Sequence, residues 1–113
     1  MDGFFARMRA NAAQLDRSVK LRPGVRISFE DPVDFLEVIT PARVRLLRQI
    51  ARKPVALGAL AAALERDPSA VRRDVALLER QRLVKTRKVS NPGHGTRTLV
   101  ERVAASIELA TTV

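Results

Sequence analysis

Apolar residues recur at helical spacing in the middle of the chain, over residues 67–84. Asp67 can cap this helix, and Pro68 follows at the first helical position, where the missing N–H of proline is tolerated. Upstream, residues 57–64 predict a shorter amphipathic helix, which only two residues separate from the cap. The two apolar stripes consist of Leu57, Leu60, Ala61 and Leu64 and of Val71, Val75 and Leu78. The pattern predicts a helix, a tight turn and a second helix.

Two further pairs of a capping residue and a proline predict helix starts earlier in the chain. Asp31-Pro32 begins a brief helix, and Thr40-Pro41 begins a longer one that ends at Lys53-Pro54. In the longer helix we expect Val44, Leu47 and Ile50 or Ala51 to face inward and Arg43, Arg45, Arg48 and Arg52 to face outward.

Alternating or β-branched stretches predict strands on both sides of this helical region. Residues 83–89 and 98–103 flank the turn-rich segment 90–97, which contains two glycines, and together they predict a β-hairpin. Residues 25–29 alternate in the same way, as do residues 106–113, and we expect these two strands to pair. The chain is therefore predicted to have an α+β fold, with a three-helix core, a β-hairpin and an extra short strand.

The first 24 residues carry a narrower apolar pattern with alternating spacings of three and four. Its members are Phe5, Met8, Ala12, Leu15 and Val19. Such a seam is typical of a helix that packs against a partner helix, so we interpret it as a dimerisation segment. A helix docked on its own domain, or a frayed terminus, are the alternatives. The expected division is an N-terminal helix over 1–24 and one globular domain over 25–113.

Composition excludes several classes of protein. The 113 residues, 46% hydrophobic and 29% charged, are typical of one ordinary globular domain. No apolar run is long enough to span a membrane and the N-terminus lacks the apolar region of a signal peptide. The absence of cysteine excludes disulfides and thiolate metal sites, and it is compatible with a cytoplasmic protein. With four Phe and no Tyr or Trp, a single-strand binder built on base stacking is not expected.

The net charge of +9 is unevenly distributed. Up to Thr40 six Lys/Arg balance six Asp/Glu, whereas from Pro41 onward fifteen Lys/Arg face six Asp/Glu. The basic region therefore coincides with the predicted helix pair, which favours a polyanionic partner. An acidic protein or an anionic membrane surface would fit the charge equally well.

No catalytic constellation is present in the sequence. The single histidine, His94, has neither a cysteine nor a second histidine with which to share a metal. Asp31 and Asp34 suit cap and first-turn positions, where a carboxylate interacts favourably with the helix dipole. Neither a phosphate loop nor a dinucleotide fingerprint occurs. We expect no enzyme, no metal site and no cofactor.

Three helices followed by a basic hairpin resemble the winged helix-turn-helix of MarR/ArsR-like transcriptional regulators. The most specific strings are SAVRRDVALLE and NPGHG, which are similar to those of short prokaryotic predicted regulators, some of them putative antitoxins encoded beside toxin genes. The resemblance covers roughly residues 26–113. It implies that the helix from Pro68 enters the major groove and that the hairpin, the wing, touches the minor groove or its flanking phosphates. Two turns depart from the pattern, because glycine commonly occurs in both: Glu65 and Arg66 occupy the turn before this helix, and Arg82 lies at its exit.

The leading hypothesis is a homodimeric, sequence-specific binder of double-stranded DNA that regulates transcription. The residues predicted to contact DNA are Ser69, Ala70, Arg72, Arg73 and Ala76 on the helix and Lys85, Arg87, Lys88, His94 and Arg97 on the wing. In the structural alternative these arginines form a solvated face, one of them paired with Asp74 or Glu79, and the hairpin is a solvated edge. The functional alternative is an antitoxin-like module that neutralises a toxin-like partner protein through the N-terminal helix.

Overall fold

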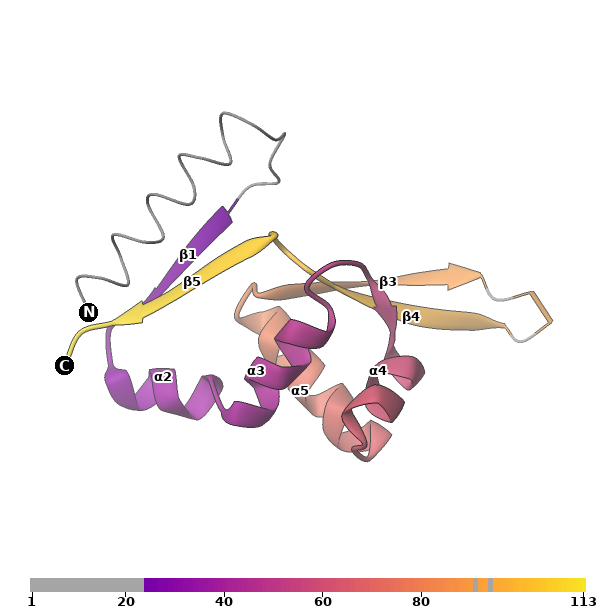
Figure 1. Ribbon diagram of the computed structural model, residues 1–113, viewed down its shortest axis with the longest axis horizontal. Coiled ribbons are helices and arrows are strands. Elements are labelled where there is room, and N and C mark those ends of the chain that lie inside the picture. Colours follow the sequence, from indigo (N-terminus) through magenta and orange to yellow (C-terminus); the bar gives the residue numbers. More distant parts are fainter. Residues whose placement is uncertain (1–23, 91, 94) are drawn as a thin grey trace.

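The computed structural model describes residues 24–90, 92, 93 and 95–113, which form an α+β fold (Figure 1). The predicted N-terminal helix lies outside these residues. In chain order the elements are β1 (Gly24–Phe29), α2 (Pro32–Val38), α3 (Pro41–Gln49), β2 (Val55–Ala56), α4 (Leu57–Leu64), α5 (Pro68–Arg80), β3 (Val84–Ser90), β4 (Thr96–Arg102) and β5 (Ser106–Thr111). None of the helices in the described ranges is long and apolar enough to cross a membrane.

All three predicted helix caps are formed. The side chains of Asp31, Thr40 and Asp67 accept hydrogen bonds from backbone N–H groups in the first turns of α2, α3 and α5, at 2.9 to 3.3 Å. A proline follows each cap at the start of its helix. Each cap satisfies donors that would otherwise lack a partner, and this fixes where the helices begin.

Two residues occupy turn positions where glycine is common, and both adopt the left-handed conformation. Glu65, after α4, has φ 53°, and Arg82, after α5, has φ 63°. Each turn closes with a hydrogen bond that spans five residues, from Arg66 N to Ala61 O and from Leu83 N to Leu78 O. This is the Schellman pattern, and it keeps both turns tight although neither left-handed residue is glycine.

The core lies between α3, α4, α5 and one face of the sheet formed by β2, β3 and β4. Its buried members are Leu46, Leu47, Ile50, Leu60, Ala61, Val71, Val75, Leu78, Leu83, Val84 and Val100. The predicted inner faces of α4 and α5 are confirmed, but the prediction for α3 is partly wrong. Leu46 is fully buried, and Arg43 turns inward because a carboxylate on α5 attracts its guanidinium. The helix also ends at Gln49, before the predicted stop at Lys53-Pro54.

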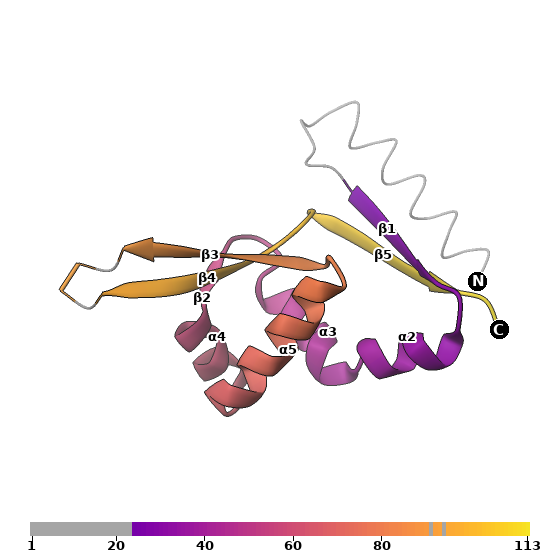
Figure 2. The same cartoon turned by 180° about the vertical axis from the view of Figure 1, so that it is seen from behind.

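The strands form two separate sheets. The predicted hairpin is confirmed as β3 and β4, to which the two-residue strand β2, not predicted from the sequence, adds an antiparallel edge. The predicted pairing of the first and last strands is also confirmed, with β1 and β5 parallel and Ile27 opposite Leu109. Seen from behind, β1, β5 and α2 lie at one end of the described structure and the wing projects from the other (Figure 2).

Candidate nucleic-acid interface

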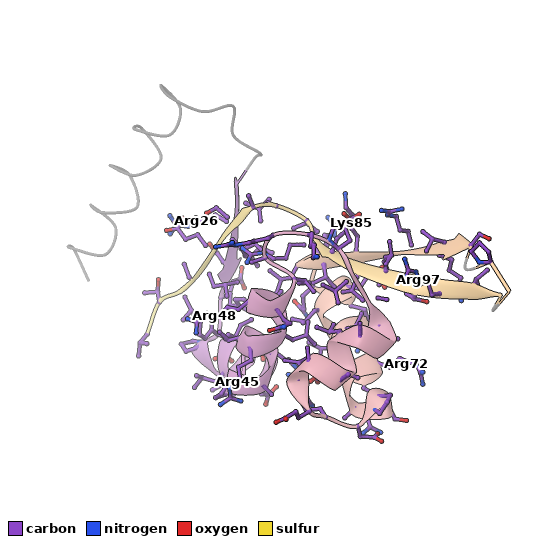
Figure 3. The ribbon with its side chains drawn as sticks, turned by 45° about the vertical axis from the view of Figure 1, so that its right-hand side comes forward. Arg26, Arg45, Arg48, Arg72, Lys85 and Arg97 are labelled. Atoms are coloured by element: carbon purple, nitrogen blue, oxygen red, sulfur yellow. The ribbon has the colours of Figure 1, made fainter. Side chains whose placement is uncertain are left out.

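The exposed face of α5 carries four of the residues predicted to contact DNA. Ser69, Arg72, Arg73 and Ala76 are all exposed, and Ala70 beside them is half-buried. Their spacings of three, one and three residues place the four exposed residues on one side of a helix. Arg72 points away from the body of the domain (Figure 3). The opposite stripe is buried, so packing fixes which side of α5 faces solvent.

Asp74 lies on the buried side of α5 and is bound by two arginines. Arg43 of α3 approaches Asp74 Oδ1 through Nε at 3.1 Å, and Arg66, from the turn before α5, approaches Oδ2 through Nη1 at 2.7 Å. Asp74 is 8% exposed, so this carboxylate depends on the two arginines for its charge compensation. Arg43 also donates to the carbonyl oxygens of Glu37 and Val38 at the end of α2. One carboxylate thereby connects α2, α3 and the turn to the helix predicted to bind DNA.

The pairing of Arg72 or Arg73 with a carboxylate on α5 is not observed. Asp74 is bound by other arginines, and Glu79 accepts hydrogen bonds from the backbone N–H and the hydroxyl of Thr86 on β3. Within the part of the chain that the structure describes, no hydrogen bond or ion pair engages the side chain of Arg72 or Arg73. Both guanidinium groups are therefore available to a ligand.

The network around Asp74 was not predicted, although the sequence contains a signal for it. Asp74 follows Val71 by three residues and precedes Leu78 by four, so it falls on the apolar stripe of α5. A carboxylate in such a stripe requires a cation from elsewhere in the fold. Which arginines supply it depends on how α3 packs, and that is not visible in the sequence.

The predicted cations of the wing divide between its two faces. Lys85 pairs with Glu101, and Val89 with Arg97, so Lys85, Arg87 and Arg97 share one face of the hairpin. Lys88, opposite Thr98, lies on the other face, the one that buries Val84 and Val100 nearer the core. All four cations are exposed. The wing can therefore present positive charge on both sides.

An acidic residue moderates the charge of the wing. Glu101 Oε1 lies 3.9 Å from Lys85 Nζ and 3.8 Å from Arg87 Nε. The tip beyond it is narrow, because Gly93 and Gly95 both have φ +80° and carry no side chain. His94, the remaining wing residue of the prediction, lies outside the described residues. No group of three histidine or acidic side chains that could hold a metal occurs in the described ranges.

Several solved structures share this fold. A possible transcriptional regulator from Methanosarcina mazei Go1 aligns at 19% identity over 58% of this chain and 57% of that chain, with a TM-score of 0.52. Reduced HlyU from Vibrio cholerae N16961 aligns at 25% identity over 63% and 70%, with a TM-score of 0.52. NolR from Sinorhizobium fredii aligns at 24% identity over 65% and 69%, with a TM-score of 0.54. The fold is therefore that of winged-helix transcriptional regulators.

The alignment spans little more than half the length of the Methanosarcina regulator. Comparisons of the sequence alone give fewer matches than comparisons of the structure. No match was found among the curated proteins. The MarR/ArsR-like resemblance therefore remains a prediction at the level of the subfamily. Residues 38–100, more than half of the chain and from the end of α2 to the middle of β4, match the model of one protein family, and the chain belongs to this family, HVO_A0114.

Proposed function

We propose that the chain binds double-stranded DNA and regulates transcription, with α5 in the major groove and the wing at the minor groove. The observation that carries this proposal is the exposed face of α5, where Arg72 and Arg73 stand beside the small residues Ser69 and Ala76. An arginine can bind the O6 and N7 acceptors of guanine with two hydrogen bonds, and small neighbours allow the helix to approach the base edges closely.

The distribution of charge supports a polyanionic ligand. From Pro41 to Ala105 the chain has fifteen Lys/Arg and five Asp/Glu. Four of these five carboxylates are already engaged within the domain: Asp67 caps α5, Asp74 binds two arginines, Glu79 binds Thr86, and Glu101 lies beside two wing cations. Few carboxylates therefore oppose a phosphate backbone, and neutralising phosphates releases condensed counterions.

The wing supplies the second contact of the proposal. Its narrow tip suits a minor groove about 6 Å wide. Arg97 and His94 belong to the tip segment in the sequence, and we expect them to enter this groove. Lys85, Arg87 and Lys88 would then bind the phosphates that border the groove. The likeness of the fold to those of HlyU and NolR supports this proposal.

A homodimer completes the proposal. Its seam would consist of Phe5, Met8, Ala12, Leu15 and Val19, all outside the described residues. A two-fold dimer places two copies of α5 about 34 Å apart, which favours a palindromic site in the genome of a prokaryotic cell. Deleting residues 1–19 should then yield a folded monomer in sedimentation velocity, and a deletion that remains dimeric would exclude this seam. An antitoxin-like role would need a toxin-like partner protein, whereas the contacts proposed above for α5 and the wing are contacts with DNA.

The proposal is tested by binding to random duplexes and to duplexes enriched by selection from a random pool, followed by fluorescence anisotropy across salt concentrations. Arg73→Ala should lose about 1–3 kcal/mol of discrimination against a changed guanine if it reads that base. An equal loss on every sequence would instead make Arg73 a phosphate contact. Arg48→Ala is the matched control, because Arg48 is exposed on α3, well away from Arg72 (Figure 3). The proposal is refuted if the wild-type chain binds duplexes no more tightly than an Arg72→Ala/Arg73→Ala double variant.

A further inference from the structure

The outer face of α2 exposes two large apolar side chains that the proposed DNA interface does not use. Val33 is 58% exposed and Leu36 is 67% exposed. They are three residues apart, so they lie side by side on the helix. The other side of α2 is packed: Val38 is buried, and Phe35 meets Phe29 of β1 edge to face with ring centroids 5.4 Å apart. We call the outer side, with Val33 and Leu36, the α2 face.

The α2 face is held in a fixed position on the domain. Asp31 caps the start of the helix, and Arg43 closes its end through hydrogen bonds to the carbonyl oxygens of Glu37 and Val38, at 2.7 and 3.0 Å. The same arginine binds Asp74. A surface that is already ordered loses little conformational entropy when a partner binds, which favours docking.

The charge around the α2 face selects its partner. Asp34 and Glu37 are exposed on the helix beside Val33 and Leu36. Across residues 24–40 a single arginine accompanies four Asp/Glu, and that arginine, Arg26, lies 3.9 Å from Glu108 of β5. DNA would be repelled, and so would the same face of a second copy. The occupant must combine apolar side chains with positive charge.

Residues 1–23 of the chain have this combination. They contain five Lys/Arg and two Asp/Glu, together with the apolar seam described above. Apart from Pro41 at its start, the exposed residues of α3 are charged or polar, so α3 of a second copy lacks the apolar part. We propose that the α2 face is the docking surface for residues 1–23.

The length of the segment agrees with this proposal. Residues 1–23 end where β1 begins, and β1 is separated from α2 by two residues. A helix of 23 residues would be about 34 Å long, whereas the six residues of β1 extend over about 20 Å. A segment that turns back before β1 is therefore long enough to pass along β1 and reach α2, and it can also reach α2 of an adjacent copy.

Photo-crosslinking in the full chain tests this docking without DNA, so its outcome is independent of the proposed DNA binding. Leu36 is replaced by p-benzoylphenylalanine, which its exposure allows, and the adducts are mapped by mass spectrometry. We expect adducts within residues 1–23. The product mass shows whether the segment comes from the same molecule or from a second copy. Either result supports the docking, and a segment from the same molecule would contradict the dimer seam proposed above. Adducts to α2 of a second copy, adducts only elsewhere in the chain, or no adduct would overturn it.

Two comparisons show whether the contact is specific. The same photo-reactive residue at position 48, exposed on α3, should give less than about a tenth of the adduct with residues 1–23. In the Leu36 probe background, Asp34→Lys with Glu37→Lys should lower the yield about two- to fivefold, in line with two exposed ion pairs. Glu65→Lys, at an exposed carboxylate between α4 and α5, should leave it unchanged. Equal yields at positions 36 and 48 would also overturn the proposal.

Discussion

Replacing Asp74 should destabilise the domain more than replacing any exposed carboxylate. Its two oxygens are bound by Arg43 and Arg66 at 3.1 and 2.7 Å, and only 11% of its side-chain surface is exposed. In Asp74→Ala both guanidinium groups lose their counter-charge and remain close to each other, because both had bound one carboxylate. Arg43 would retain its bonds to the end of α2, so it cannot leave the site without losing these as well.

The size of this effect follows from the burial of the three groups. Removing one member of a fully buried ion pair costs about 3–5 kcal/mol of folding free energy. Here the side chains of Arg43 and Arg66 keep 18% and 29% of their surface exposed, so water compensates part of the loss. We expect a decrease of about 2–3 kcal/mol for Asp74→Ala, and of similar size for Asp74→Asn, which retains the shape but not the charge. With roughly 4 °C per kcal/mol in a domain of this size, the midpoint of thermal unfolding should fall by about 8–12 °C.

Urea unfolding followed by far-UV circular dichroism measures this change. Asp34→Asn serves as the control, because Asp34 is exposed on α2 and should alter the unfolding free energy by no more than about 0.5 kcal/mol. A cycle of Asp74→Ala with Arg66→Ala should give a coupling energy above about 1 kcal/mol. If Asp74→Ala and Asp34→Asn agree within about 0.5 kcal/mol, the network does not stabilise the fold and the reasoning is wrong.

Three further predictions concern the stability of the domain and its binding to DNA. Arg82→Gly should raise the unfolding free energy, measured in urea, by about 0.5–1 kcal/mol, because it relieves the left-handed strain at φ 63°. Arg80→Gly, inside the last turn of α5, should lower the unfolding free energy. If both substitutions change the unfolding free energy in the same direction, this explanation is contradicted. Glu101→Gln should increase duplex affinity about two- to fivefold at low salt by freeing the wing cations, and weaker binding would show that this face does not meet DNA. Arg97→Ala should reduce the slope of log affinity against log salt by about 1, whereas an unchanged slope and affinity would leave Arg97 out of the interface.

The elements that local chemistry defines were predicted well. The cap-and-proline pairs placed the starts of α2, α3 and α5, because a capping side chain and the fixed φ of proline act within one turn. The hairpin and its turn followed from β-branched residues around two glycines. The pairing of β1 with β5 was also predicted correctly, although nearly the whole domain separates the two strands; their parallel direction was not part of the prediction. Two alternating strands left without a neighbour could satisfy their backbone groups with each other.

Features that depend on packing between distant elements could not be predicted. The sequence pattern predicts Arg43 on the surface with Arg45, Arg48 and Arg52, because all four fit a solvated stripe of the predicted helix. The inward position of Arg43 results from Asp74, 31 residues away, and only the crossing of α3 and α5 brings the two together. Strand β2 has two residues, which is too short for any alternation to be recognised. The predicted DNA contacts stay predictions.

That neither Arg72 nor Arg73 pairs with a carboxylate of α5, in contrast, follows from helix geometry and from one contact between α5 and β3. Side chains one or two residues apart on a helix do not face each other, so neither arginine can pair readily with Asp74. Glu79 is six or seven residues further along, and it is held by Thr86 across the turn into β3. Asp74 and Glu79 are therefore both engaged within the fold, whereas Arg72 and Arg73 remain exposed on the helix. In an interface of this kind, changing Asp74 should mainly alter the stability of the domain. Changing Arg73 should alter DNA binding with little effect on stability.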